Sequence, residues 1–484
     1  MSLKNKIVLL AILFLALALR LWAILNVGDF SWDEMFSFLY SQKPWGEAWH
    51  FWIWETNPPL HLAFLKTWFL IFPANEFFAR LPSAIFGTLT VFTIYKTGLR
   101  FFNEKIALLA GLLLALHPYH IFLSTFGRGY ALLILLAAVS FYYFLKIFIQ
   151  NENSRKNYII LAAVNLAMAL THLTAFIFLL AETAVVLIKN AKKIKEWILL
   201  HLAPAALWLA WAIPAFLSKK QNTAFGSAWF LNFDPNPLNI FIPLKLFFLG
   251  PGQNFFLYGL MILFLIALII RLKERGKEFP FLAALAVFAL TIFFTLLLTL
   301  WNIRFLIFAL PAFLILAAVL INDFIEKKAW AIIFTILIAA PGLFYINQAC
   351  PLFDWGRINN FLSANHDAAK KQIFVYNDFI EKLLADRYYR APMPAKAYLG
   401  GKEKNWDKKI IFGNYLRYPR SDEETRQWYE TERLDDFDEI FLLYSPDVGV
   451  DLPLLFKKQG WRLKSISLVS PGRDERKIYK YVKN

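Results

Sequence analysis

Two adjacent carboxylates, Asp33 and Glu34, follow the first apolar segment of the chain. At a membrane surface such a pair offers a general base and a helper for removing the proton of a hydroxyl group. The same two residues are candidate ligands for a divalent metal ion, and the sequence leaves the need for such a cofactor open. A structural role is the alternative, because acidic residues in the first turn of a helix interact favourably with the helix dipole.

The same segment continues with Asn57 and His61, which flank the pair Pro58-Pro59. Proline suits the first turn of a helix, so these residues predict a helix start. Asn57 and His61 are therefore either substrate-binding groups near that start or simple polar anchors.

Four further polar residues are candidates for substrate binding, namely His120, Arg128, His172 and Arg304. Both arginines are expected at helix starts, where a cation opposes the helix dipole. Binding of an anionic group explains that placement. Snorkelling to lipid headgroups is the alternative for Arg128, and interfacial anchoring is the alternative for Arg304. For His172 the alternative is a histidine whose hydrogen bonds are satisfied inside the protein.

The elements that must position these residues are membrane helices. Of 484 residues 58% are hydrophobic, whereas a soluble domain is about half apolar. The apolar residues form runs of about 18 or more, the length of a helix that crosses a bilayer. The run 59–72 is too short to cross easily, so we expect an interfacial helix there. The expected spans are 7–25, 81–99, 106–123, 130–149, 158–171, 172–188, 197–216, 254–271, 279–299, 305–321 and 329–347.

The net charge of +16 comes largely from basic residues in short loops between these runs. This is the pattern of cytoplasmic loops in membrane proteins and does not indicate a nucleic-acid partner. It predicts an N-terminus inside and a C-terminus outside. The single cysteine excludes an intramolecular disulfide framework. The chain has no Asn-x-Ser/Thr acceptor site, so we expect a multi-pass protein of a prokaryotic cytoplasmic membrane.

This topology brings Asp33, Glu34, Arg128, His172 and Arg304 to the outer face. The predicted fold is an all-α polytopic membrane bundle of about eleven transmembrane helices plus interfacial helices. It occupies residues 1–348 and includes a catalytic outer loop at 26–80. Residues 349–484 are expected to form a small extracytoplasmic α/β domain. That tail has strand-like runs at Gln372–Tyr376, Lys409–Phe412 and Glu439–Tyr444 and a helical stretch at Glu423–Glu432.

The order of these motifs resembles the GT-C superfamily of glycosyltransferases, in the branch of protein O-mannosyltransferases and the bacterial aminoarabinose lipid A transferase. The motifs are spread over most of residues 1–320. They are Asp33-Glu34, Asn57-Pro58-Pro59-Leu60, Arg80-Leu81-Pro82-Ser83, Ser124 to Tyr130, Thr171-His172 and Arg304-Phe305 through Pro311.

The resemblance implies a cell-envelope enzyme that takes a sugar from a polyprenyl-phosphate donor by an inverting, single displacement. Asp33 would then be the base for the acceptor hydroxyl, with Glu34 beside it. Arg128 and Arg304 would bind the donor phosphate, and His172 would lie near the donor. The acceptor, whether lipid, protein or glycan, is not indicated. Relatives often carry His or Lys in place of Asn57, and an acid within the stretch Ser124–Arg128.

Two other classes of protein compete with this interpretation. A transporter or lipid flippase of the cell envelope would explain the helices and the charged outer rim, but it would not need an adjacent acid pair. A structural subunit of an envelope complex would need no acid at all. Enzymatic activity of the purified protein separates both from a glycosyltransferase.

Overall fold

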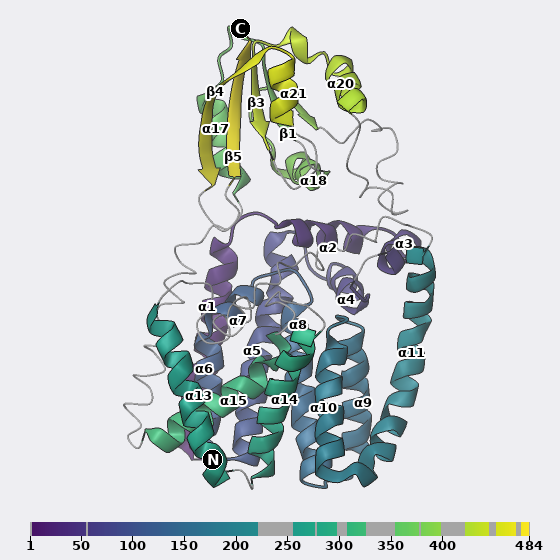
Figure 1. Ribbon diagram of the computed structural model, residues 1–484, viewed down its shortest axis with the longest axis vertical. Coiled ribbons are helices and arrows are strands. Elements are labelled where there is room, and N and C mark those ends of the chain that lie inside the picture. Colours follow the sequence, from purple (N-terminus) through teal and green to yellow (C-terminus); the bar gives the residue numbers. More distant parts are fainter. Residues whose placement is uncertain are drawn as a thin grey trace. The chain divides into compact units, whose positions relative to one another are not determined.

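The computed structural model describes residues 2–54, 57–220, 255–275, 278–297, 307–325, 354–376, 379–397, 422–444, 452–470 and 476–483. The chain divides into two compact units (Figure 1). The first unit comprises Met1–Leu25, Glu55–Ser218 and Ser227–Gln348. The second comprises Asn26–Trp54, Lys219–Gly226 and Ala349–Asn484. The segment that carries the acid pair thus belongs to the same unit as the C-terminal tail.

The first unit is helical throughout its described part. Five of its helical segments are long and apolar enough to cross a membrane: Leu3–Asn26, Glu76–Phe101, Tyr130–Ile149, Ala191–Leu217 and Ile307–Phe324. Within the described residues its α-helices are α1 (Leu3–Asn26), α4 (Leu60–Trp68), α5 (Glu76–Phe101), α6 (Glu104–Leu116), α7 (Pro118–Leu123), α8 (Tyr130–Phe144), α9 (Arg155–Ala169), α10 (Ala175–Asn190), α11 (Ile194–Lys220), α13 (Phe255–Arg275), α14 (Phe279–Leu297) and α15 (Leu310–Phe324).

Side-chain caps explain where several of these helices begin. Asn75 accepts a hydrogen bond from the Phe78 amide at the start of α5, and Asn103 accepts one from the Ile106 amide at the start of α6. Ser154 caps α9 in the same way. Each cap satisfies one of the amides that the first turn of a helix leaves unpaired.

Small residues allow the helices of this unit to approach closely. A Cβ at Gly98 of α5 would lie 2.7 Å from the Ala107 Cα of α6, so only glycine fits at this position. Next to the hairpin formed by α5 and α6, aliphatic side chains of α6, α8, α14 and α15 form the main apolar core. The two helices of the α5–α6 pair are therefore held in contact over a tight turn at Phe102 and Asn103.

Two predictions about the helices are confirmed, and one is wrong. The apolar run 158–188 is two helices, because α9 ends at Ala169 and α10 begins at Ala175. The run 59–72 holds only α4, whose nine residues extend about 14 Å, too short to cross a bilayer. The expected single span 106–123 is broken, since α6 ends at Leu116 and α7 begins at Pro118. The break has a physical cause, because proline lacks the amide that would continue α6. The expected span 329–347 lies outside the described residues.

A polar chain crosses the helical unit between α8 and α11. The Ser140 hydroxyl donates to the Asn165 carbonyl oxygen at 2.7 Å and also lies 3.2 Å from Oε1 of the buried Glu182. The Asn165 amide nitrogen lies 2.9 Å from Nε2 of His201. These contacts join four helices through groups that would otherwise be costly to bury.

The second unit combines two helices from the N-terminal part of the chain with an α/β fold. The helices are α2 (Trp32–Gln42) and α3 (Trp45–Trp54). The tail contains α17 (Trp355–Ala364), β1 (Gln372–Tyr376), α18 (Phe379–Tyr388), β2 (Ala395–Ala397), α20 (Asp422–Thr431), β3 (Glu439–Leu443), α21 (Leu452–Lys458), β4 (Trp461–Ser470) and β5 (Arg476–Lys483). The expected strands at Gln372–Tyr376 and Glu439–Tyr444 and the helix at Glu423–Glu432 are confirmed. The expected strand Lys409–Phe412 lies outside the described residues.

The five strands form one mixed sheet in the order β2-β1-β3-β5-β4. Strand β1 pairs in parallel with β2 and β3, while β5 is antiparallel to β3 and β4. In the central pair Ile373 lies opposite Ile440 and Val375 lies opposite Leu442. All four side chains are buried, as expected for the inner strands of a sheet that is covered by helices.

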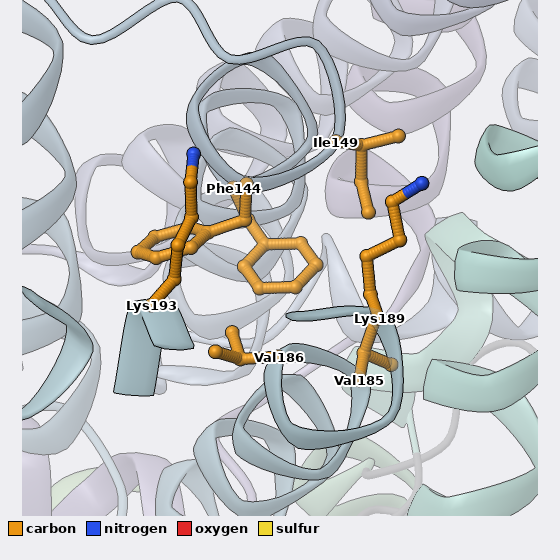
Figure 2. A pocket seen from close by; sticks show the side chains of 7 residues that line it. Phe144, Ile149, Val185, Val186, Lys189 and Lys193 are labelled. Atoms are coloured by element: carbon orange, nitrogen blue, oxygen red, sulfur yellow. The ribbon is translucent and has the colours of Figure 1, made fainter. Parts of the chain in front are cut away.

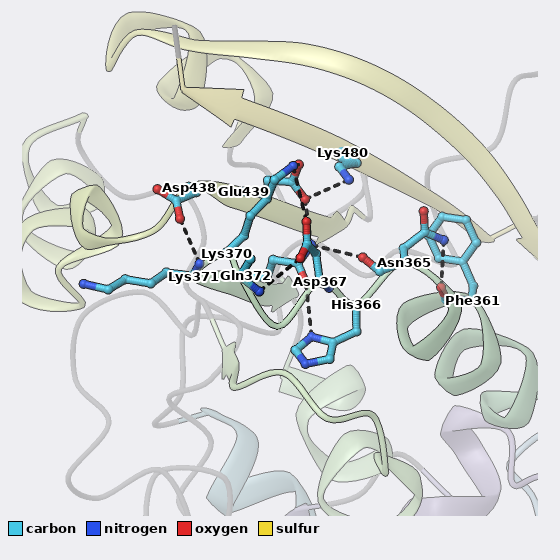
Figure 3. A network of polar contacts seen from close by, with 11 residues as sticks. Phe361, Asn365, His366, Asp367, Lys370, Lys371, Gln372, Asp438, Glu439 and Lys480 are labelled. Carbon is cyan, nitrogen blue, oxygen red and sulfur yellow. Dashed lines mark hydrogen bonds and ion pairs between the residues drawn. The ribbon is translucent and has the colours of Figure 1, made fainter.

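A buried carboxylate at the start of β3 ties the sheet together (Figure 3). Glu439 accepts hydrogen bonds from Lys480 at 2.8 Å, Gln372 at 2.7 Å and Lys370 at 2.9 Å. Burial alone would raise the pKa of Glu439, but the three donors outweigh it and hold the pKa at about 2. The carboxylate therefore stays ionised and links β1, β3 and β5.

Candidate active site

The acid pair lies in the first turn of α2, in the second unit. Ser31 is the N-cap, and its hydroxyl accepts from the Glu34 amide at 3.3 Å while Glu34 Oε2 accepts from the Ser31 amide at 2.9 Å. This reciprocal arrangement is a capping box. Glu34 is buried, with 2% of its surface exposed, whereas Asp33 is half-buried. The two neighbours thus differ, since Glu34 sets the helix start and Asp33 is the more accessible carboxylate.

Residues of the C-terminal tail hold the start of this segment. The Trp355 amide at the beginning of α17 donates to Asp29 Oδ2 at 2.6 Å, and the Phe30 amide donates to the Tyr388 hydroxyl at 3.1 Å. The guanidinium of Arg387 stacks over the Phe38 ring, with its Cζ 4.7 Å from the ring centroid. Asp33 therefore sits on a helix that α18 contacts at Phe38 and whose preceding residues, Asp29 and Phe30, are held by α17 and α18.

The described residues offer no larger metal-binding group around this pair. Among them no cluster of three or more His, Cys, Asp and Glu side chains is placed to hold a metal ion. The capping contact engages Glu34, and Asp33 is the more exposed carboxylate of the pair.

A second group of candidates meets in the first unit. A Cβ at Gly129 would lie 3.3 Å from the His61 Cβ and 3.0 Å from the Thr171 Cγ2. The Leu60 amide donates to the Leu170 carbonyl at 2.9 Å. The start of α4, the turn that carries Arg128 and the turn between α9 and α10 are therefore in contact. A side chain at Gly129 would be tightly packed against both neighbours, so glycine favours this approach.

The charges and hydrogen bonds of this group are well defined. Burial and the nearby charge of Arg128 lower the pKa of His61 to about 3, so His61 is neutral at ordinary pH. His172 Nδ1 accepts from the Thr174 amide at 3.2 Å, and its ring lies 6.0 Å from the Tyr130 ring between centroids. Of the candidates named from the sequence, Arg128 and His61 are thus brought close together. A buried cation beside a neutral imidazole suits an anionic group.

His120 makes a different contact, with a residue that the sequence analysis missed. Its Nδ1 lies 2.6 Å from Nη2 of Arg20 on α1, and both side chains are fully buried. Arg20 is a single charge inside an apolar run, so hydropathy alone includes it in a membrane span. One signal in the sequence could have identified Arg20. Charged residues are rare within membrane helices, because they are costly there and usually functional.

Two other candidates are placed less closely. Asn57 is half-buried just before α4. Arg304 lies outside the described residues. A separate, shallow apolar pocket lies between the end of α8 and α10, lined by Phe144, Phe148 and Val186 together with Lys189 and Lys193 (Figure 2). None of the candidate residues lines it.

Comparison with known proteins identifies the architecture. Residues 56–218 match the family model of dolichyl-phosphate-mannose-protein mannosyltransferases. The crystal structure of ArnT from Cupriavidus metallidurans bound to undecaprenyl phosphate superposes with a TM-score of 0.57 at 15% identity, over 99% of this chain and 98% of that one. The chain has the GT-C glycosyltransferase fold. The resemblance that the sequence motifs predicted is thereby confirmed.

More distant GT-C structures agree. The oligosaccharyltransferase of Archaeoglobus fulgidus, in a complex with Zn and sulfate, matches with a TM-score of 0.52 at 13% identity over 90% of this chain and 68% of its own. The related AglB complex with an inhibitory peptide and a dolichol-phosphate gives 0.52 over 91% and 70%. No curated protein sequence matches significantly. Together with its apolar helices, the GT-C fold makes the chain a multi-pass membrane protein.

Proposed function

We propose that this protein is a membrane glycosyltransferase that moves a sugar from a polyprenyl-phosphate donor to an acceptor on the extracytoplasmic face. The observation that carries the proposal is the fold, which follows ArnT over nearly the whole length of both chains. The ArnT structure contains undecaprenyl phosphate and the AglB structure contains a dolichol-phosphate. A lipid-phosphate donor is the ligand class that these two have in common.

The proposed reaction is a single displacement that inverts the anomeric carbon. The acceptor hydroxyl attacks that carbon and forms the new glycosidic bond, while the bond to the phosphate oxygen breaks and polyprenyl phosphate leaves. The leaving phosphate needs little protonation, so the difficult proton is that of the acceptor. Asp33 accepts it, which contributes roughly 10² to 10⁴-fold to the rate. Glu34 supports Asp33 by holding the start of α2 in place.

Arg128 is the proposed partner of the donor phosphate, with His61 and His172 beside it. A guanidinium can bind a phosphate through two parallel hydrogen bonds. The neutral imidazole of His61 supplies hydrogen bonds without further charge. We assign Arg304 to the same phosphate and Asn57 and His120 to other parts of the donor. The acceptor is a lipid, protein or glycan whose hydroxyl group Asp33 deprotonates.

We further propose that residues 1–348 form the transmembrane glycosyltransferase domain, with 26–80 as its catalytic outer loop, and that 349–484 are extracytoplasmic. The run of short basic loops supports an N-terminus inside. A prokaryotic cytoplasmic membrane is the proposed location.

The test is incubation of the purified protein with a panel of polyprenyl-phosphate sugars and acceptors, scored by release of free polyprenyl phosphate. One donor should be consumed, and Asp33→Asn should lower kcat by at least about 10²-fold while donor binding stays near normal. Glu34→Gln is the matched control and should do less, because its side chain still reaches the Ser31 amide. Wild-type turnover in both variants would exclude Asp33 as the base. Lipid movement without cleavage would favour a flippase.

A further inference from the structure

The buried arginine of α1 is stabilised by hydrogen bonds to backbone carbonyl oxygens. Arg20 Nη1 donates to the Ala16 carbonyl at 2.7 Å and to the Ala115 carbonyl at 3.3 Å. Nη2 donates to the Leu114 carbonyl at 3.4 Å. Leu114 and Ala115 belong to the last turn of α6, where helix carbonyls lack their usual i+4 amide partners. The Leu114 carbonyl also accepts from the His117 amide at 3.3 Å. The cation thus caps the negative end of the α6 dipole.

Space for this guanidinium depends on a glycine of α5. A Cβ at Gly87 would lie 2.7 Å from Arg20 Nε and 2.3 Å from the Ser124 hydroxyl oxygen. That hydroxyl in turn donates to the His120 carbonyl at 2.6 Å. Helices α1, α5, α6 and α7 therefore pack around the guanidinium of Arg20, next to the helix break between α6 and α7.

The contact between Arg20 and His120 fixes the state of the imidazole. Arginine has only hydrogen-bond donors. Nδ1 of His120, 2.6 Å from Arg20 Nη2, must therefore be the acceptor and carries no proton. The neutral ring then bears its hydrogen on Nε2, because the bond made by one ring nitrogen sets the state of the other.

That Nε2–H group is buried, and among the described residues it has no hydrogen-bond partner. A buried donor without an acceptor is unfavourable, so the site is complete only when an oxygen atom accepts from it. We propose that Arg20 is a positioning residue, which holds His120 as the Nε2–H tautomer so that it donates to an oxygen of the sugar-phosphate donor. The identity of the ligand in this inference rests on the proposed function. The tautomer of His120 does not, because it follows from the contact with Arg20.

The first test needs no activity. With ¹⁵N-labelled histidine in the wild-type protein, the His120 signals are assigned by their loss in His120→Gln, and the other six histidines serve as references. We expect a protonated Nε2 and an unprotonated Nδ1 that stay so across the neutral pH range. A protonated Nδ1, in either the neutral or the charged ring, would overturn the proposal. In Arg20→Lys the single tautomer should give way to a mixture.

The second test asks whether the donor uses this hydrogen. In His120→Gln the amide nitrogen lies near the place of Nε2 and keeps a donor there, whereas His120→Asn reaches only the place of Nδ1. Binding of undecaprenyl phosphate, and of the sugar-linked donor that the activity panel identifies, is measured for both. Asn should weaken binding about 10-fold or more, and Gln should restore most of it. Glu182→Gln is the control for loss of a buried polar group elsewhere in the bundle.

The outcomes separate the possible ligand oxygens. If His120→Asn weakens the binding of both undecaprenyl phosphate and the sugar-linked donor, the oxygen that accepts from Nε2 belongs to the phosphate. If it weakens the binding of the sugar-linked donor alone, that oxygen belongs to the sugar. Equal binding by the Asn and Gln variants would show that the donor does not use Nε2, and a buried water would then be the acceptor. If the panel identifies no active donor, the proposed function fails, while the tautomer measurement still decides the role of Arg20.

Discussion

Removal of one hydroxyl group, in Tyr388→Phe, should loosen the helix that carries Asp33. The Phe30 amide donates to that hydroxyl at 3.1 Å, and Phe30 itself is fully buried. Phenylalanine leaves the amide without this acceptor, at a cost of about 1–3 kcal/mol. Because 1.36 kcal/mol corresponds to a factor of ten, the opening equilibrium of α2 should rise about 5- to 150-fold.

Hydrogen exchange measures this opening directly. The amides of α2 (Trp32–Gln42) should exchange faster in Tyr388→Phe, while those of α5 in the first unit should not change. Asp29→Ala should act in the same direction through the lost bond to the Trp355 amide, and Asp29→Asn should do less because it keeps an acceptor. The double variant should fall short of the sum, since both bonds hold one segment. Unchanged exchange of α2 in both Tyr388→Phe and Asp29→Ala would refute the anchoring of this helix by α17 and α18.

Three further predictions concern other parts of the chain. Arg128→Ala should raise the donor KM or lower kcat, and Arg128→Lys should recover only part of the loss because lysine lacks the bidentate fork; wild-type kinetics in both variants would make Arg128 a surface anchor. Glu439→Gln should destabilise the sheet at pH 7 by roughly 3 kcal/mol, because the fold lowers the pKa of Glu439 from 4.5 to about 2. The ionised carboxylate stabilises the fold above pH 4.5, and this contribution disappears as the pH falls toward 2. Thermal unfolding followed against pH should therefore show the wild type losing its advantage over that interval, and equal melting of both proteins at pH 7 would contradict it. An impermeant thiol reagent should label an introduced cysteine at Ser363 but not one at Ser154 from outside, and the reverse pattern would invert the topology.

Local signals in the sequence predict the helices well. The runs of α1 and α5 are plain from hydropathy, and Asn75 marks the start of α5. The motif Ser31-x-x-Glu34 is the signature of a capping box, so the structural role of Glu34 was visible before the fold was known. The break between α6 and α7 also had a signal, Pro118. A prediction from hydropathy alone misses it, because the apolar run continues on both sides of the proline.

Contacts between distant segments were not predictable. The Asp29 to Trp355 bond joins residues 326 positions apart, and the Phe30 to Tyr388 bond spans 358. Nothing near Asp29 in the sequence indicates a partner so far along the chain. The grouping of the acid pair with the C-terminal tail therefore emerges only from the fold, as does the contact of Gly129 with His61.

The chain makes Arg20 long before it makes the partners of Arg20. Ala115 and His120 come 95 and 100 residues later, which at about 5–20 residues per second is roughly 5–20 s of synthesis. During that time the nascent α1 has only its own Ala16 carbonyl to offer the guanidinium. The cost of inserting such a charge is up to roughly 3.5 kcal/mol at the centre of a membrane helix and lower near an end, and Arg20 lies in the last third of α1. Helix α1 should therefore settle in the bilayer late, together with α6 and α7, and should stay near the insertion machinery until they arrive.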